Sequence, residues 1–133
     1  PAGSGKILSL LEVCVSPVVV GAGSTEVGLA GNYNPVAAAV THTTPLTVRN
    51  AYLGKGNTSV GLADSSATLP ASPTLMRYIL SAANATGSVS GKGLIKDDVG
   101  GAVLIGPGCS VSLSYLTTAI TACCSMTWED LDE

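Results

Sequence analysis

The chain has 133 residues, of which 46% are apolar, 11% charged and 4% aromatic, and it contains no phenylalanine. Its 15 Leu, 14 Val and 5 Ile residues can form a core, and its 16 Gly and 7 Pro residues follow no three-residue period, so the composition excludes a disordered chain and a collagen. The formal net charge is −3, and four of the nine acidic residues lie in the last five positions. The rest is nearly neutral, which argues against a nucleic-acid partner because phosphate binding needs clustered Lys and Arg.

The length suits a single domain with a short extension at each end. We expect a flexible N-terminal arm over 1–6, a β-sandwich domain over 7–128 and an acidic C-terminal tail over 129–133. The chain opens without the basic and apolar regions of a secretory signal, so we expect a protein made in the cytoplasm without a signal peptide. The uncharged stretch Val99–Trp128 is interrupted by Gly106-Pro107-Gly108 and by alternating Ser and Thr, so no membrane partner is expected.

Val, Ile and Thr are abundant, which favours strands over helices. The first predicted strand, Ile7–Val15, is apolar on both faces, a pattern typical of a strand covered on both sides. The region between Asp64 and Thr74 contains two prolines and predicts a long crossover loop, with a helical turn there or at Ala37–Val40 as the alternative. Further strands, separated by Gly, Pro and Asn turns such as Gly54-Lys55-Gly56, are expected in the middle of the chain. They are Val36–Val40, Leu46–Leu53, Thr58–Leu62, Leu75–Leu80 and Ser88–Lys96.

The clearest alternation lies near the C-terminus, where apolar residues alternate with serines over Cys109–Leu116. The short apolar run Ala102–Ile105 precedes it, and Gly106-Pro107-Gly108 predicts the turn that joins these two neighbouring strands. A last strand is expected at Ala119–Trp128. Its inward-facing residues are Ile120, Ala122, Cys124, Met126 and Trp128. About eight strands result, which favours an all-β, eight-stranded jelly-roll-like β-sandwich over an immunoglobulin-like stack.

The four cysteines, Cys14, Cys109, Cys123 and Cys124, allow three ways of forming two disulfides, or none. Cys109 and Cys124 lie on apolar strand faces, where a thiol behaves as a small hydrophobic group. The adjacent Cys123 and Cys124 point to opposite faces, which argues against a shared metal ion. Free thiols in a reducing compartment are therefore expected.

Residues that could act in catalysis or bind a ligand are few. His42, the only histidine, could serve as a general base beside a serine, but no glycine-framed nucleophile accompanies it, so we expect a loop histidine in a protein that is not an enzyme. Gly3-Ser4-Gly5-Lys6 is like the end of a P-loop, yet Ile7 stands where Ser or Thr is needed. Asp97 and Asp98 predict a hairpin cap rather than a cation site, so neither a metal nor a cofactor is expected.

Small residues dominate the chain, since Gly, Ala, Ser and Thr account for 60 of its 133 positions. A core built from such residues is thin, and a domain of this size has little stability to spare. Self-association would cover the charge-poor segments Val13–Thr25 and Val27–Val48 and hide sheet edges. We therefore expect an obligate homo-oligomer.

Two motifs in the last part of the chain carry a resemblance to a family. They are Leu104-Ile105-Gly106-Pro107-Gly108-Cys109-Ser110-Val111-Ser112-Leu113 and Met126-Thr127-Trp128-Glu129-Asp130. Together with the small-residue composition, they resemble the small jelly-roll decoration (cement) proteins of tailed bacteriophages, which assemble as trimers on the outside of the major capsid shell. The resemblance implies a homotrimer in the virion, with the major capsid protein as its partner and stabilisation of the shell as its function.

Both ends of the chain are predicted contacts with the capsid. The N-terminal arm is small and positively charged and could lie along a capsid subunit; its residues are Pro1, Ala2, Gly3, Ser4, Gly5 and Lys6. The acidic end could form an unstructured solubilising tail or reach a basic patch of the partner; its charged residues are Glu129, Asp130, Asp132 and Glu133. The alternative function is a receptor- or carbohydrate-binding head domain of a phage fibre, for which Trp128 and the tyrosines would supply aromatic platforms.

Overall fold

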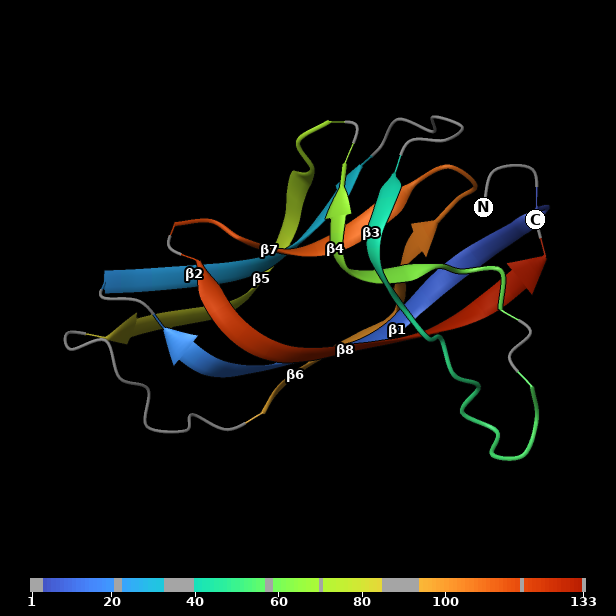
Figure 1. Cartoon of the computed structure of the whole chain (residues 1–133), viewed down its shortest axis with the longest axis horizontal. Coiled ribbons are helices and arrows are strands. Elements are labelled where there is room, and N and C mark those ends of the chain that lie inside the picture. Colours follow the sequence, from blue (N-terminus) through green and yellow to red (C-terminus); the bar gives the residue numbers. More distant parts are fainter. Residues whose placement is uncertain are drawn as a thin grey trace.

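The computed structural model describes residues 4–20, 23–32, 40–56, 59–69, 71–84, 94–117 and 119–132. Over these ranges the chain is all-β, with eight strands in three antiparallel sheets and no helix (Figure 1). The strands are β1 (Lys6–Val20), β2 (Gly23–Asn32), β3 (Thr41–Leu46), β4 (Ala63–Thr68), β5 (Thr74–Asn84), β6 (Ile95–Ile105), β7 (Ser110–Tyr115) and β8 (Ile120–Asp132). The expected all-β class and number of strands are confirmed.

The strand order is β6-β1-β8 in the first sheet, β5-β2-β7 in the second and β3-β4 in the third. Each of the last three connections, from β5 through to β8, carries the chain from one three-stranded sheet to the other. Consecutive strands at this end therefore do not pair with each other. The two neighbouring strands expected at Ala102–Ile105 and Cys109–Leu116 thus lie in different sheets. The turn between them is confirmed, since Cys109 N donates to Gly106 O at 3.0 Å and Gly108 has a φ of 79°.

The core lies where β1 and β6 of the first sheet meet β2 of the second. Its buried residues are Leu10, Val13, Val15, Leu29, Val99 and Val103. Leu10 and Val13 lie three positions apart, yet both are buried, because the register of β1 shifts between Leu10 and Glu12 and resets the alternation of faces. Strand β1 is covered along much of its length, as its two apolar faces predicted.

An irregularity in β6 opposes the one in β1. Leu10 pairs with Val103, but Glu12 pairs with Asp98, so the segment between them on β6 bulges outward. Gly100 and Gly101, with φ of 58° and 79°, supply the left-handed backbone that this bulge requires. The expected hairpin cap at Asp97 and Asp98 is therefore wrong. Both residues lie inside the continuous strand β6, and the two glycines that follow them form a bulge in this strand and not the turn of a hairpin.

An ion pair joins the two three-stranded sheets at the edge of the core. Arg77 on β5 donates from Nη2 to Asp97 Oδ1 at 3.1 Å, and its Nε lies 3.1 Å from Asp97 Oδ2. The first contact is a charge-assisted hydrogen bond, whereas the buried Asp97 Oδ2 lies near the guanidinium without accepting a hydrogen bond. Since Asp97 belongs to β6, this pair links the second sheet to the first.

Periodic segments were predicted well. The strands expected at Leu75–Leu80 and Cys109–Leu116 correspond to β5 and β7, and that at Ala119–Trp128 to most of β8. Cys124 keeps the alternation of β8, on the face of Ala122 and Met126, but its side chain is exposed, so the expected inward position is wrong for this residue. The predicted Ala102–Ile105 is the end of the longer strand β6, which also contains Ile95 and Lys96 of the predicted Ser88–Lys96; residues 88–93 lie outside the described residues.

Other expectations are corrected. Leu46 belongs to β3, but 47–53 form no strand and lead into a turn in which Lys55 N donates to Tyr52 O at 3.2 Å. Residues 59–62 are also not a strand, and the crossover loop expected from Asp64 contains most of β4. Strand β2 was not predicted at all. Residues 36–39 of the predicted strand Val36–Val40 lie outside the described residues, as does residue 58 of the predicted strand Thr58–Leu62.

Candidate functional site

The start of β1 lies beside the end of β8, because the two strands pair antiparallel. The start of β1 and the end of β8 lie together in Figure 1, and Lys6 and Asp132 are Cα partners in this pair. The Lys6 ammonium forms an ion pair with the Asp132 carboxylate. The hydrogen bond and the charge of Asp132 raise the pKa of Lys6, and the same contact lowers the pKa of Asp132. The segments predicted as separate capsid contacts thus form one patch, which we call the chain-end patch: Ser4 to Lys6 and Glu129 to Asp132.

Asp130 faces inward and holds a loop. Its Oδ1 accepts a hydrogen bond from Ser59 Oγ at 2.9 Å, and its Oδ2 accepts one from Val60 N at 2.9 Å. A carboxylate that accepts two hydrogen bonds from another segment is a structural group, not a solvated charge. The interpretation of 129–133 as an unstructured tail is therefore wrong, because Glu129 to Asp132 continue strand β8.

Trp128 completes the same network two residues earlier on β8. Its Nε1 donates to Ser59 Oγ at 2.9 Å, and Gly61 N donates to the same oxygen at 3.0 Å. A side chain on Gly61 would meet Leu8 Cδ1 and Trp128 Nε1 at 3.0 Å, so the loop packs closely against the indole. Trp128 is half-buried under this loop and does not form the open platform that a sugar-binding head would use.

The other predicted contact residues are placed as follows. Ser4 Oγ accepts a hydrogen bond from Lys6 N at 3.3 Å, and Gly5 has a φ of 65°. Glu129 is exposed and opposes Ser9 on β1. Pro1, Ala2, Gly3 and Glu133 lie outside the described residues. The structure therefore brings Lys6, Glu129, Asp130 and Asp132 to one end of the β1–β8 pair but turns Asp130 away from solvent.

His42 lies on β3, not in a loop as expected from its neighbours. Its Nδ1 is 2.5 Å from Asp64 Oδ2 on the paired strand β4, and the Asp64 side chain is only 7% exposed. Two hydroxyls near this pair donate hydrogen bonds to backbone carbonyls. Thr43 Oγ1 donates to Thr41 O, and Ser65 Oγ donates to Thr44 O. The pair joins the two strands of the third sheet.

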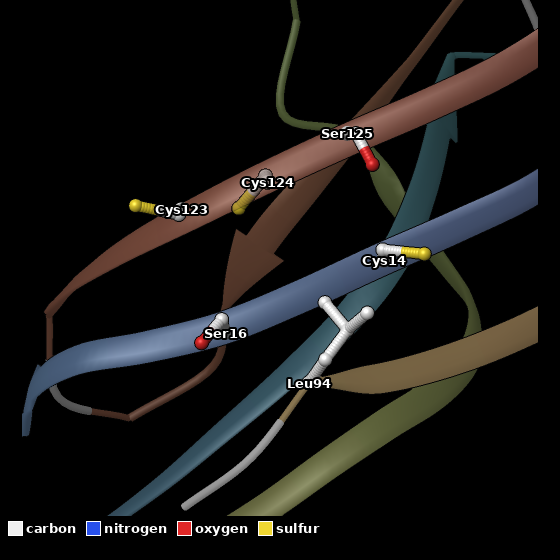
Figure 2. A pocket seen from close by; sticks show the side chains of 6 residues that line it. All are labelled: Cys14, Ser16, Leu94, Cys123, Cys124 and Ser125. Carbon is white, nitrogen blue, oxygen red and sulfur yellow. The ribbon is translucent and has the colours of Figure 1, made fainter. Parts of the chain in front are cut away.

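Three of the four cysteines line a small open pocket at the far end of β1 and β8 (Figure 2). Its volume is about 200 Å³, and its lining residues are Cys14, Ser16, Leu94, Cys123, Cys124 and Ser125. We call it the thiol pocket. All four thiols, which lie within the described ranges, are free, and the pocket was not foreseen because its two strands are distant in sequence.

Two thiols of the pocket, Cys14 and Cys124, are poor nucleophiles. Cys14 Sγ donates to Glu12 Oε1 at 3.2 Å, and this carboxylate is paired with Lys96 Nζ at 2.5 Å. The hydrogen bond to Glu12 and burial both raise the pKa of Cys14, and burial raises that of Cys124. Because the thiolate is the reactive form, this arrangement disfavours reaction of Cys14 and Cys124 at neutral pH.

Metal and membrane sites were also considered. Within the described residues, no group of three or more His, Cys, Asp or Glu side chains is arranged to hold a metal ion. The described part of the chain also has no helix of the length and apolarity needed to cross a bilayer.

Comparison with known proteins gives no relative. No family model matches the chain, and no similar curated protein or solved structure was found.

Proposed function

We propose that this protein is a capsid decoration (cement) protein of a tailed bacteriophage, a non-enzymatic subunit that binds the outside of the major capsid shell and stabilises it. The observation that carries this proposal is the exposure of many large apolar side chains on the described strands and turns. Such a surface suits a subunit that functions within a larger assembly.

The distribution of apolar side chains supports the same view. The buried core cluster has six members, whereas eleven large apolar side chains in the described ranges are exposed. They are Val18, Leu46, Tyr52, Leu53, Leu62, Tyr78, Leu94, Leu104, Tyr115, Leu116 and Leu131. Single exposed apolar residues are common, but this number beside so small a core favours burial against other subunits. We propose a homotrimer on these grounds.

The alternation of strands between sheets supports a jelly-roll-like sandwich. In such folds the chain passes repeatedly between two facing sheets, and β5 to β8 follow that path. The β3–β4 hairpin stands apart as a third sheet in this proposal, as an insertion between β2 and β5.

Shell binding is assigned to the chain-end patch. It presents the Lys6 ammonium and the carboxylates of Glu129 and Asp132, so it can pair with groups of both signs on a capsid subunit. A protein that binds only the assembled shell stabilises it by mass action, by about 2.7 kcal/mol per site at a hundredfold excess over Kd. A trimer that engages several sites at once gains further from effective concentration.

The test is quantitative mass spectrometry of virions purified from the phage that encodes the chain. A decoration protein is present in a fixed, high ratio to the major capsid protein, and we expect virions that carry Lys6→Glu to lose occupancy. A copy number in the low tens, typical of a fibre, or absence from the particle would refute the proposal. Glu26→Gln, on β2 of the second sheet, is a control that leaves the chain-end patch unchanged.

A receptor- or carbohydrate-binding head of a phage fibre is the second candidate. Tyr52, Tyr78 and Tyr115 are 66%, 64% and 59% exposed, and exposed aromatic rings suit sugar faces. Selective binding of the purified protein on a glycan array, with loss on substitution of these tyrosines, would favour this function. Tyr33, also considered for this role, lies outside the described residues.

A further inference from the structure

Strand β8 has a strand partner on only one of its two sides. Within the described residues it pairs with β1 alone and is an outer strand of the sheet β6-β1-β8. It is 13 residues long and continuous, because the extra residues at its two register shifts with β1 lie on β1. Its outer side therefore presents a row of backbone N–H and C=O groups to which a further strand can pair.

The usual protection of an edge strand is missing from most of β8. Natural edges are interrupted by bulges, or carry Pro, Lys or inward-facing charges that prevent pairing. The opposite edge of the same sheet has such protection, since β6 bulges at Gly100 and Gly101. On β8 the charges lie in the last residues, including the inward-facing Asp130. The preceding nine residues, Ile120–Trp128, contain no charge and no proline, so this uncharged run is the unprotected part of the edge.

The uncharged run is nearly symmetric in the chemistry of its side chains. Residues at equal distances on either side of Cys124 are alike: one pair is small, two pairs are apolar and one pair consists of two threonines. The matched pairs are Cys123 with Ser125, Ala122 with Met126, Thr121 with Thr127, and Ile120 with Trp128. Two antiparallel copies of the run, related by a two-fold axis at Cys124, place each residue opposite its match, and Thr–Thr and apolar pairs stabilise neighbouring strands. The strand that fits this edge is thus a second copy of β8.

The charges of β8 favour the same antiparallel orientation. Glu129, Asp130 and Asp132 all lie at one end of the strand. Two β8 strands aligned in parallel would place each carboxylate opposite the same carboxylate of the other copy, which is destabilising. In the antiparallel pair centred on Cys124, the acids of one copy extend past Ile120 of the other. The two acidic ends are then separated by the length of the uncharged run.

The centre of the run is accessible to a partner. Cys123, Cys124 and Ser125 are all exposed, although successive residues of a strand point to opposite faces. Their side chains are small and do not obstruct a strand that approaches the edge. Thr121 and Thr127 are also exposed, so the residues that would face each other across the contact are free of the core.

We propose that two copies of this chain pair through their β8 strands, antiparallel around a two-fold axis at Cys124, so that their sheets join into one of six strands. The contact goes beyond the proposed function and does not depend on it, since it needs no shell. A two-fold contact joins copies in pairs, so it is separate from the contact that holds the proposed trimer and would link one trimer to the next. The chain-end patch stays accessible, because Lys6 lies on β1 and the acidic end extends beyond the paired run.

A pair of double variants tests both the contact and its register. In the proposed pair, Thr121 of one copy faces Thr127 of the other. Thr121→Lys with Thr127→Lys places like charges opposite each other twice, whereas Thr121→Lys with Thr127→Glu places opposite charges there. The two positions are six residues apart in one strand, about 20 Å, so these charges do not pair within one chain.

Association is measured by sedimentation equilibrium. We expect the Lys/Lys variant to pair about tenfold to a hundredfold more weakly than the Lys/Glu variant, so that the mass of its assembly falls by half while the Lys/Glu variant keeps the wild-type mass. Thr74→Lys with Ser81→Lys, at exposed positions of β5, adds the same charge as the Lys/Lys variant and is the matched control that should keep the wild-type mass. All these positions are exposed, so the variants should fold normally, which circular dichroism verifies.

Hydrogen exchange of the unmodified protein tests the contact without any substitution. Amides on the outer side of β8 are hydrogen-bonded only in the pair, so peptides from Ile120–Trp128 should exchange faster when the protein is diluted. Peptides from the opposite edge strand β6 should exchange at the same rate at every concentration.

Several outcomes would overturn the proposal. Equal weakening of the Lys/Lys and Lys/Glu variants would exclude this antiparallel register, and equal masses of wild type and both variants would exclude β8 as the contact. A wild-type mass of 13.2 kDa at all concentrations, or exchange in Ile120–Trp128 that does not depend on concentration, would exclude pairing. An unpaired protein found at high copy number on virions would leave the proposed function intact, whereas a paired protein absent from virions would refute that function and leave the β8 contact standing.

Discussion

Replacement of Asp130 by alanine tests whether the acidic end belongs to the fold. The change removes both hydrogen bonds that hold the 59–61 loop, one from Ser59 Oγ and one from Val60 N, each 2.9 Å long. A hydrogen bond to a charged group contributes about 1.5–3 kcal/mol, and the two bonds share one carboxylate, so we expect a loss of about 2–4 kcal/mol. For a chain of this size, that corresponds to a fall in Tm of about 8–15 °C.

The assay is thermal unfolding followed by circular dichroism and by the emission of Trp128, the only tryptophan. Because the indole donates to Ser59, a loosened loop should expose it to water and shift its emission to longer wavelength before global unfolding. Asp130→Asn keeps one acceptor oxygen and should fall between wild type and Asp130→Ala. Glu129→Ala, the exposed neighbour on the same strand, is the matched control and should change stability by no more than about 0.5 kcal/mol. If Asp130→Ala and Glu129→Ala have the same small effect, the carboxylate is solvated and the assigned network is wrong.

Three further predictions concern the backbone, an ion pair and the thiols. Gly101→Ala should cost about 1–2 kcal/mol, because its φ is 79°, whereas Gly106→Ala has open space around it and should be neutral; urea titration of both variants decides this. The pKa of Glu12 is lowered in the folded state by its hydrogen bond to an ammonium, so its contribution to stability is present above its ordinary pKa of 4.5 and is lost as the pH falls through the lowered value. Unfolding free energies of wild type and Glu12→Gln should therefore converge in acid, and a constant difference would contradict the assignment. Cys14 is buried with a raised pKa and should react with iodoacetamide only on unfolding, whereas the exposed Cys123 should react in the folded protein; equal rates by mass spectrometry would refute this.

The period of the sequence predicted those strands that carry apolar side chains on one face and polar side chains on the other. The alternation of Ser112 and Ser114 with Val111 and Leu113 predicted β7, and that of Met126 and Trp128 with polar neighbours predicted β8. Such alternation reports burial of one face directly, so it does not depend on knowing which strands pair.

Strand β2 could not be predicted because two of its residues are glycines, which are needed there for close packing against the neighbouring strand. Gly28 and Gly31 are weak strand formers, but a side chain at Gly28 would lie 2.3 Å from Leu75 Cδ1, and one at Gly31 would lie 2.7 Å from Met76 Sδ. The neighbouring strand β5 fills the space that these glycines leave. That relation spans more than forty residues of sequence, and no local pattern reports it.

The chain-end network was missed for a related reason, but a signal was present. Four acids in the last five positions indicate a solvated tail by composition. The alternation of Met126 and Trp128, carried two residues further, places Asp130 on the same inward face. Its partners, Ser59 and Val60, are about seventy residues away, so the inward face could have been predicted whereas the hydrogen bonds could not.

Shell binding through the chain-end patch can be separated by experiment from association between copies. The patch lies at Lys6, at one end of the β1–β8 pair. Lys6→Glu should reduce shell occupancy without changing the mass of the free protein, which sedimentation equilibrium measures. If Lys6→Glu changed the mass of the free protein as well, the chain ends would belong to the interface between copies, and the shell contact would have to be sought elsewhere.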